Sequence, residues 1–286
     1  MSYIETKNFH AGEGNRLFVY FYGLIFSSKF NIIYIHPGIP SLNIKSTLHL
    51  KKNNRLPFKK IINYKEELAV CNIDENLNYI LDYGYNPTIE NYKIFIPYFD
   101  FLKKKFPPII KKNNNLVFHF RAGDNILTRN YRYIGNSEKI KTLIDNIEYD
   151  KLYVVTNLKI HKHWTISDLN NYKEKLLKYG DCGARYTNSG LLDKVDLKES
   201  LKNLNSLIDV LNNKNAIWIS DTIFNDFNTI RESNKIIIGI STFSWWAAIL
   251  SNASEVYASK NWKFLKGNRN KNLPFVELDN WKAVDF

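Results

Sequence analysis

The sequence predicts an α/β protein made of two doubly wound units. Short apolar runs alternate with longer segments of helical periodicity, which is the pattern of repeated strand–helix–strand units. The apolar runs contain few polar residues, as expected of parallel strands that are covered on both faces. A chain of 286 residues has room for two such units, and 44% hydrophobic residues are enough to form a core in each.

The boundary between the units is expected near residue 110. Pro107 and Pro108 stop a helix predicted over 91–106, and a polar run of lysine and asparagine follows over 111–115. Domain boundaries fall in polar, proline-containing segments of this kind. We therefore divide the chain into domains 1–110 and 111–286. Two units joined by a short hinge would face each other across a cleft, which is a preferred place for a ligand.

The N-terminal unit opens as a β-α-β pattern. We expect a strand over 3–9, a glycine turn, a helix that runs to Ser28, and a strand over 31–36 that ends at Pro37-Gly38. The following region, 40–80, is polar and lacks clear periodicity. We expect short strands near Leu48 and Leu77 there.

The C-terminal unit alternates strands and helices throughout. We expect strands at 116–120, 152–156, 216–220, 235–239 and 255–258, and helices near 137–147, 165–179, 196–212, 223–232 and 244–251.

Composition and charge limit the function classes. Only 2 cysteines are present, Cys71 and Cys182, so a disulfide framework is excluded and a reducing, cytoplasmic compartment is favoured. No N-terminal signal pattern and no apolar run of about 20 residues is present. A net charge of +12 indicates nucleic acid, an anionic membrane face or an anionic ligand as partner. Coding bias toward lysine, asparagine and isoleucine explains the same charge without any partner.

A mid-chain strand runs into a cationic turn. The apolar run Leu116–Phe120 is followed by Arg121, Gly123 and Asp124. Ligands of open α/β sheets bind outside the carboxyl ends of the strands, and the planar fork of arginine matches phosphate oxygens. A salt-bridged turn would have the same residues, so the stretch alone does not decide between the two.

Two further stretches resemble anion sites. The segment Gly12-Glu13-Gly14-Asn15-Arg16 is a glycine turn that enters a helix, and Ser241, Thr242 and Ser244 follow a buried strand and open another helix. Free N–H groups at a helix start attract anions. The simpler interpretations are a tight turn at the first and N-capping at the second.

Together the three stretches resemble the GDP-fucose-dependent fucosyltransferases, above all the bacterial α-1,2-fucosyltransferase family. The similar motifs are Gly12-Glu13-Gly14-Asn15-Arg16, His119-Phe120-Arg121-Ala122-Gly123-Asp124 and Ser241-Thr242-Phe243-Ser244-Trp245-Trp246. Gly84-Tyr85 and Lys260-Asn261-Trp262 are also similar to that family. The resemblance implies a GT-B fold and an inverting, metal-independent transfer of sugar from a GDP-sugar to a glycan acceptor, with no cofactor. It places the acceptor on the 1–110 side and the nucleotide on the 111–286 side.

The resemblance also implies a role for individual residues. Arg121 would clamp the donor diphosphate with Ser241, Thr242, Phe243 and Ser244, while His119 and Gly123 would line the nucleotide pocket. Asp226 would accept the N1/N2 edge of guanine. Gly12, Gly14, Asn15 and Arg16 would face the reacting sugar, with Glu13 and Asp124 as candidates for the base that takes the acceptor proton.

Three departures from the family pattern put the sugar or the linkage in doubt. Ala122 stands where a second arginine is usual, Arg16 where a glutamine is usual, and Glu13 where a leucine is common. Two other interpretations remain open. One is a non-catalytic GDP or glycan binder on the same fold, and the other is a basic nucleic-acid-binding protein, for which no recognition motif is present.

Overall fold

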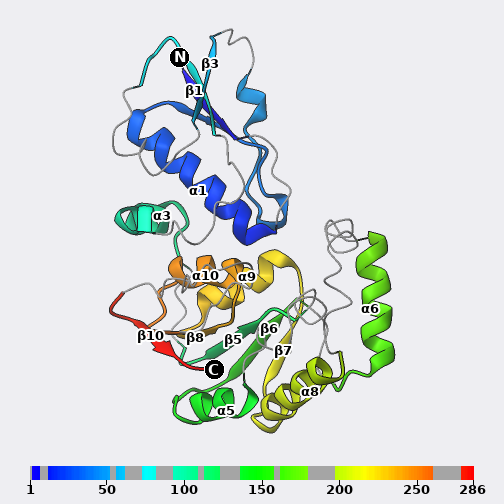
Figure 1. The fold of residues 1–286 in the computed structure, drawn as a ribbon. Coiled ribbons are helices and arrows are strands. Elements are labelled where there is room, and N and C mark those ends of the chain that lie inside the picture. The colour runs from blue at the N-terminus through cyan, green and yellow to red at the C-terminus, as the bar shows by residue number, and fades with distance from the viewer. Residues whose placement is uncertain are drawn as a thin grey trace, which may run out of the picture. The chain divides into compact units, whose positions relative to one another are not determined.

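The structure is a computed structural model that describes residues 2–6, 12–51, 56–61, 73–81, 93–108, 113–122, 136–157, 162–179, 197–259 and 278–286. Contacts between residues divide the chain into two compact units, Met1–Pro107 and Pro108–Phe286. We call these unit 1 and unit 2 and describe each by itself (Figure 1). Both are mixed α/β units, and every strand pair described in them is parallel.

Unit 1 contains a four-stranded sheet in the order β2-β1-β4-β3. Its elements are β1 (Tyr3–Thr6), α1 (Glu13–Phe30), β2 (Ile33–Ile35), β3 (Phe58–Ile61) and β4 (Asn78–Leu81). The first three form the β-α-β opening that the sequence predicts, because β1 and β2 pair in parallel across the α1 connection. The strand predicted over 3–9 extends into 7–11, outside the described residues.

Helix α1 packs its apolar side on the strands that flank it. Residue Gly23 lies against Tyr34 of β2, and a Cβ atom at Gly23 would come within 2.3 Å of the tyrosine ring. The glycine therefore permits the close approach of helix and strand. The helix ends at Asn31, which adopts the left-handed conformation (φ 53°) that asparagine tolerates at a helix end.

The rest of unit 1 agrees with the sequence prediction in part: the strand predicted near Leu77 is β4, whereas the one predicted near Leu48 is absent. Leu48 lies in a 3₁₀ helix, η2 (Leu48–Lys51), and not in a strand. Its side chain is 47% exposed, so it does not supply the buried face that a core strand needs. Strand β3 was not predicted, because its FKKI sequence lacks an apolar run. Two more short helices are η1 (Pro40–Leu42) and η4 (Ile96–Tyr98).

The helix predicted over 91–106 is shorter than expected. It is described as η4 followed by α3 (Phe99–Lys105), and residues 91–92 lie outside the described part. Phe106, at the end of α3, packs edge-on against Phe21 of α1 with ring centroids 5.2 Å apart. The proline pair that ends this segment is the point at which the contacts divide the chain.

Unit 2 contains a six-stranded parallel sheet in the order β10-β9-β8-β5-β6-β7. The strands are β5 (Leu116–Phe120), β6 (Leu152–Thr156), β7 (Ile217–Ile219), β8 (Lys235–Ile238), β9 (Glu255–Ser259) and β10 (Trp281–Val284). When the strands are numbered along this unit, the order becomes 6-5-4-1-2-3, which is the order of the Rossmann fold. The five predicted strands agree with the structure, and β10 was not predicted.

Helices cover both faces of the unit 2 sheet (Figure 1). They are α5 (Ser137–Asp145), α6 (Ile166–Tyr179), α8 (Leu197–Asn213), α9 (Ile223–Glu232) and α10 (Thr242–Ile249). Side chains of α5 and α8 share one apolar core with Phe118 and Phe120 of β5. Helices α9 and α10 contact each other and pack on β5, β6 and β8 from the other face. This is the doubly wound arrangement that the alternating sequence predicts.

Candidate functional site

The carboxyl ends of β5 and β8 form the switch point of the unit 2 sheet. These strands are neighbours, yet one opens the first half of the unit and the other opens the second half. The helices that follow them, α5 and α10, lie on opposite faces of the sheet (Figure 1). Open α/β sheets bind their ligands in the crevice that such a divergence leaves.

His119 is buried near the end of β5 on the α9–α10 face of the sheet. Alternation along a strand sends it to the face opposite Phe118 and Phe120, and its ring centroid lies 6.0 Å from that of Phe243. The side chain is 5% exposed, and its Nδ1 atom has no hydrogen-bond partner among the described residues. Burial, followed by the charge of Arg121, lowers the pKa of His119 to about 3. His119 is therefore neutral at pH 7.

Arg121 is half-buried directly after β5. It follows Phe120, the last residue of β5, and therefore begins at this edge of the sheet; its charge helps to lower the pKa of His119. Ala122 is fully buried in the core shared with α5 and α8. An arginine at that position would need to leave the core, so this strand end supplies one described cation where the fucosyltransferase motif usually has two.

Gly239 keeps β5 and β8 close at the switch point. Its N–H donates to the carbonyl oxygen of His119 at 2.8 Å. A Cβ atom at Gly239 would lie 2.8 Å from that same oxygen and 3.3 Å from Cα of Phe120. Both neighbours are backbone atoms of a central strand, so they have little freedom to move aside.

The N-terminus of α10 presents backbone donors at the end of β8. Ser241 is the N-cap residue, and its side chain makes no capping hydrogen bond. The N–H groups of Thr242 and Phe243 belong to the first turn, which has no acceptors within the helix. Ser244 is fully buried, and its hydroxyl donates to the carbonyl oxygen of Ser241 at 3.2 Å. Ser244 therefore braces the turn, and the donors offered to a ligand are mainly backbone N–H groups.

Two tryptophans hold α10 in place. Trp245 and Trp246 are buried to 1% and 0% exposure and pack edge-on with ring centroids 4.8 Å apart. The helix was predicted over 244–251 and in fact begins two residues earlier, at Thr242. Ser241 is the N-cap residue by position, but the side-chain capping that the simpler interpretation predicted is not present. The backbone donors of this turn are therefore left for an anion.

Asp226 lies in the first turn of α9, beside the start of α10. The adjacent Phe227 packs on Phe243 with ring centroids 5.1 Å apart. Asp226 is 8% exposed, and its Oδ1 accepts the N–H of Asp221 at 3.0 Å. Burial is the main cause that raises its pKa. The Oδ1 atom thus stabilises the loop before α9. The Oδ2 atom has no hydrogen bond to another described residue.

Other predicted site residues begin helix α1 in unit 1. Gly12 is the N-cap residue, with φ −62° and ψ 153°, a conformation open to any residue. No atom lies within 4 Å of where its Cβ would be. Asn15 is half-buried and its N–H donates to the Gly12 carbonyl oxygen at 2.9 Å. Gly14 is buried in the first turn. Because Gly12 has an extended backbone, the tight turn predicted there is not present at this residue.

Glu13 and Arg16 are each held by unit 1 itself. An Oε1 atom of Glu13 accepts the hydroxyl of Ser41 at 3.3 Å. Nη2 of Arg16 donates to the carbonyl oxygen of Gly38 at 3.1 Å. Gly123 and Asp124, the remaining predicted site residues, lie outside the described residues, as do Gly84, Tyr85 and the segment 260–262.

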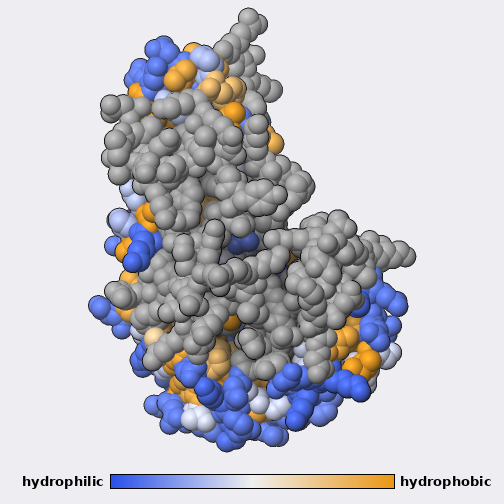
Figure 2. Space-filling view, in the orientation of Figure 1, coloured by the Kyte–Doolittle hydropathy of each residue, from blue (hydrophilic) through white to orange (hydrophobic). Residues whose placement is uncertain are grey.

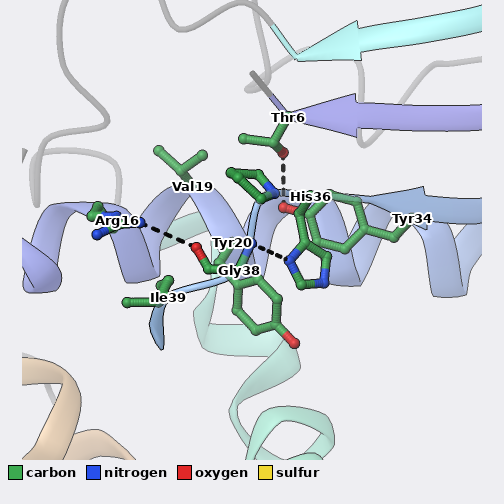
Figure 3. Close-up of a pocket in the computed structure, with 9 residues that line it drawn as sticks. Thr6, Arg16, Val19, Tyr20, Tyr34, His36, Gly38 and Ile39 are labelled. Carbon is green, nitrogen blue, oxygen red and sulfur yellow. Dashed lines mark hydrogen bonds between the residues drawn. The ribbon is translucent and has the colours of Figure 1, made fainter. Parts of the chain in front are cut away.

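A small cavity adjoins Arg16 at the carboxyl edge of the unit 1 sheet (Figure 3). Its volume is about 20 Å³. Sequence reasoning missed His36, which is buried beside it, although the strand-ending motif His36-Pro37-Gly38 was a usable signal. The lining residues are Thr6, Arg16, Val19, Tyr20, Tyr34, His36, Pro37, Gly38 and Ile39.

The surface of the described residues gives few further indications of function. Hydrophilic residues cover much of the face over α5 and α8 (Figure 2). Within the described ranges, no helix has the length and apolar character needed to cross a membrane. The same ranges contain no cluster of three or more His, Cys, Asp or Glu residues arranged to hold a metal ion.

Comparison with known proteins adds no argument about the fold or the activity. No family model matches the chain, and no curated protein matches it. Among solved structures, the chain is similar to KpsC of Thermosulfurimonas dismutans, a beta Kdo 2,7 transferase, at 9% sequence identity and a TM-score of 0.26. The alignment covers 91% of this chain and 78% of that one. This similarity is too low to support an argument about activity.

Proposed function

We propose that the protein is an inverting glycosyltransferase that moves fucose, or a related sugar, from a GDP-sugar to a glycan hydroxyl. The observation that carries the proposal is the edge formed by β5 and β8. Three of the motif residues that resemble those of fucosyltransferases, His119, Arg121 and Ser241, come together there at the switch point of a sheet with Rossmann order. The motifs are far apart in sequence, and their meeting at one edge is what a shared diphosphate site requires.

The chemistry of this edge suits a departing diphosphate. Transfer from a GDP-sugar builds negative charge on the leaving group, and fixed donors aimed at that charge lower the barrier. Arg121 supplies a positive charge, and the first N–H groups of α10 supply oriented dipoles. Each hydrogen bond to a charged group contributes roughly 1.5–3 kcal/mol. A few that strengthen in the transition state would supply much of the catalysis without a metal ion.

Guanine recognition is proposed for Asp226. Its carboxylate would accept the pair of donors on the N1/N2 edge of guanine, a pair that adenine and uracil cannot supply. Because Oδ1 is already engaged by Asp221, the contact would be weaker than that of a carboxylate with both oxygens available. The packing of Phe227 on Phe243 supports a base pocket next to the diphosphate donors.

The acceptor is proposed to bind unit 1, in a GT-B arrangement of the two units. Asn15 and Arg16 would then lie next to the reacting sugar. Glu13 is a candidate for the base that takes the acceptor proton, although its bond to Ser41 must loosen for that role. Asp124 is the alternative base. The departures at Glu13 and Arg16 add charge where the family has leucine and glutamine, so the linkage need not be α-1,2.

The proposal is tested by donor turnover in the presence of a metal chelator. GDP-fucose, GDP-mannose and UDP-galactose are each incubated with the protein and a mixture of glycan acceptors, and release of nucleoside diphosphate is measured. We expect GDP release from at least one GDP-sugar and none from UDP-galactose. Turnover of UDP-galactose at a similar rate would contradict the assignment. Binding of GDP-sugars without any turnover would favour the non-catalytic binder.

A further inference from the structure

Segment 93–108 of unit 1, which contains η4 and α3, is attached to helix α1 by aromatic side chains. Phe95 packs edge-on against Phe18 of α1, with ring centroids 5.6 Å apart. Phe106 packs in the same way against Phe21 of α1, at 5.2 Å. Because both ends of the segment are anchored on α1, one side of it is covered and the other side is turned away from that helix.

The outer side of α3 combines an aromatic ring with lysines. Phe99 and Leu102 are buried and mark the inner side. With about 3.6 residues per turn, Phe101 and Lys104 lie on the opposite side, and Lys104 is exposed. Nζ of Lys105 lies 5.9 Å from the centroid of the Phe101 ring. The half-buried ring of Phe101 therefore has positive charge beside it at the surface.

Two apolar residues of η4 adjoin this side. Ile96 is 40% exposed, and Pro97, which precedes Phe101 by about one helical turn, is also exposed. Apolar surface that stays in water is unfavourable in proportion to its area, and contact with another apolar surface would recover that free energy. We call the surface made of Ile96, Pro97, Phe101, Lys104 and Lys105 the α3 face.

The α3 face lies in a strongly basic part of the chain. The segment contains four lysines and one acid, Asp100, which gives a net charge of +3 (4 − 1). Burial lowers the pKa of Lys103, and the charge of Asp100 partly offsets that effect. Asp100 thus acts on the least exposed of the four lysines, while Lys93, Lys104 and Lys105 are exposed. Positive charge gathered at one surface attracts a negatively charged partner.

We propose that the α3 face docks on an anionic lipid bilayer. Its lysines would lie at the level of the headgroup phosphates, and its apolar residues would enter the boundary between headgroups and acyl chains, as interfacial membrane-binding elements do. Nucleic acid would also attract the lysines, but its phosphate backbone offers Ile96 and Pro97 no apolar contact. The inference does not depend on the glycosyl transfer proposed above.

The test is co-sedimentation of the full chain with lipid vesicles at an ionic strength of about 0.15 M. One set of vesicles contains phosphatidylglycerol and phosphatidylcholine in equal parts, and the other set contains phosphatidylcholine alone. We expect the protein to bind the anionic vesicles at least about tenfold more tightly. Equal affinity for both sets, or no binding to the anionic set, would overturn the proposal.

A pair of double variants tests whether the α3 face or the net charge is responsible. Lys104→Gln/Lys105→Gln is expected to weaken binding to anionic vesicles at least about tenfold, because each lysine near an anionic surface contributes about fivefold. Lys151→Gln/Lys202→Gln removes two exposed lysines, and so the same charge, from unit 2, and it should bind as tightly as the wild type. Equal losses in the two double variants would contradict the α3 face as the docking surface.

A second pair of variants tests the apolar contribution. Ile96→Ser is expected to weaken vesicle binding about fivefold, because less apolar surface leaves water. Ile166→Ser is the matched control, since Ile166 begins α6 of unit 2 and is also 40% exposed. Unchanged binding by Ile96→Ser would show a contact made by charge alone, and it would overturn the insertion of apolar residues.

Duplex DNA is the competitor that separates the two anionic partners. We expect DNA to leave most of the protein on the anionic vesicles when the two phosphate concentrations are equal. Displacement of the wild type by DNA would assign the α3 face to nucleic acid instead. All four variants change exposed side chains, so their thermal unfolding should match that of the wild type, and changes in binding then report on the surface.

Discussion

The two units both place a neutral, buried histidine near an arginine at the carboxyl edge of a parallel sheet, but they satisfy these groups differently. In unit 1, Gly38 bonds to both His36 and Arg16. In unit 2, Nδ1 of His119 has no partner in the described part of the chain, and the first turn of α10 has no side-chain cap. The edge of unit 2 therefore has more to gain from a ligand.

This difference separates two kinds of binding site. A buried polar group without a partner, such as Nδ1 of His119 in the described part of the chain, costs roughly 1–3 kcal/mol. The edge of unit 2 therefore lowers the folding stability of this unit. Local destabilisation of this kind is common at functional sites. Unit 1 has a small cavity whose walls are braced by internal hydrogen bonds, which leaves less for a ligand to satisfy.

The largest expected effect concerns the junction of β5 and β8. In Gly239→Ala the added methyl would meet the His119 carbonyl at 2.8 Å, and β5 and β8, which form the proposed donor site, would have to separate. We expect a loss of about 2–3 kcal/mol in unfolding free energy, as for other overpacked positions, measured by denaturant unfolding. Gly12→Ala is the matched control in unit 1. Its Cβ would meet no atom within 4 Å, so only the preference for glycine over alanine at an N-cap applies, and the loss in unfolding free energy should stay below about 1 kcal/mol.

A smaller effect is expected for guanine selectivity. In Asp226→Asn the amide oxygen can still accept the N–H of Asp221, so unit 2 should remain folded. The variant removes a buried carboxylate whose pKa is raised by desolvation. We expect GDP affinity to fall about tenfold, which corresponds to one weak charge-assisted hydrogen bond, and the affinity for inosine diphosphate, which keeps N1–H but lacks the 2-amino group, to fall less. Asp221→Asn removes an exposed carboxylate nearby and should leave GDP affinity unaltered, as measured by calorimetry.

The histidines predict how acid affects each unit. Both folded pKa values, about 4 for His36 and about 3 for His119, lie below the ordinary value of 6.5. The unfolded chain therefore binds more protons below pH 6.5, and stability falls as the pH falls toward the folded values. Each histidine contributes a slope of about 1.4 kcal/mol per pH unit in that window. His119→Asn should flatten the acid dependence of unit 2 unfolding and His36→Asn that of unit 1. If the slopes of stability against pH match the wild type in both variants, other groups govern the acid dependence.

The sequence predicted unit 2 better than unit 1. Strands such as β5 and β8 are continuous apolar runs, which is what burial on both faces requires. Strand β3 has the sequence FKKI and could not be recognised by that rule. β10 has the sequence WKAV, in which Lys282 interrupts the apolar run, and it is defined by pairing with β9. Both are strands at the edge of their sheet, where pairing and not hydrophobicity determines the structure.

The site was predicted in part for a similar reason. His119, Arg121 and Ser241 were identified because motifs at strand ends are local in sequence. The role of Gly239 depends on the approach of a second strand, which no local pattern contains. His36 was missed because its partner Gly38 looks like an ordinary strand terminator. Its environment is created by Tyr20 and Tyr34, which come from two different elements.

The central claim is that the β5–β8 edge binds GDP through Arg121. The most direct measurement is a calorimetric titration with GDP, and with UDP as control, on the wild type and on Arg121→Ala without divalent metal. Lys139→Ala, which removes an exposed charge from the same unit, is the matched control. We expect micromolar GDP binding by the wild type and by Lys139→Ala, at least about tenfold weaker binding by Arg121→Ala, and little binding of UDP. Equal affinity for UDP, or GDP binding that does not depend on Arg121, would contradict the account.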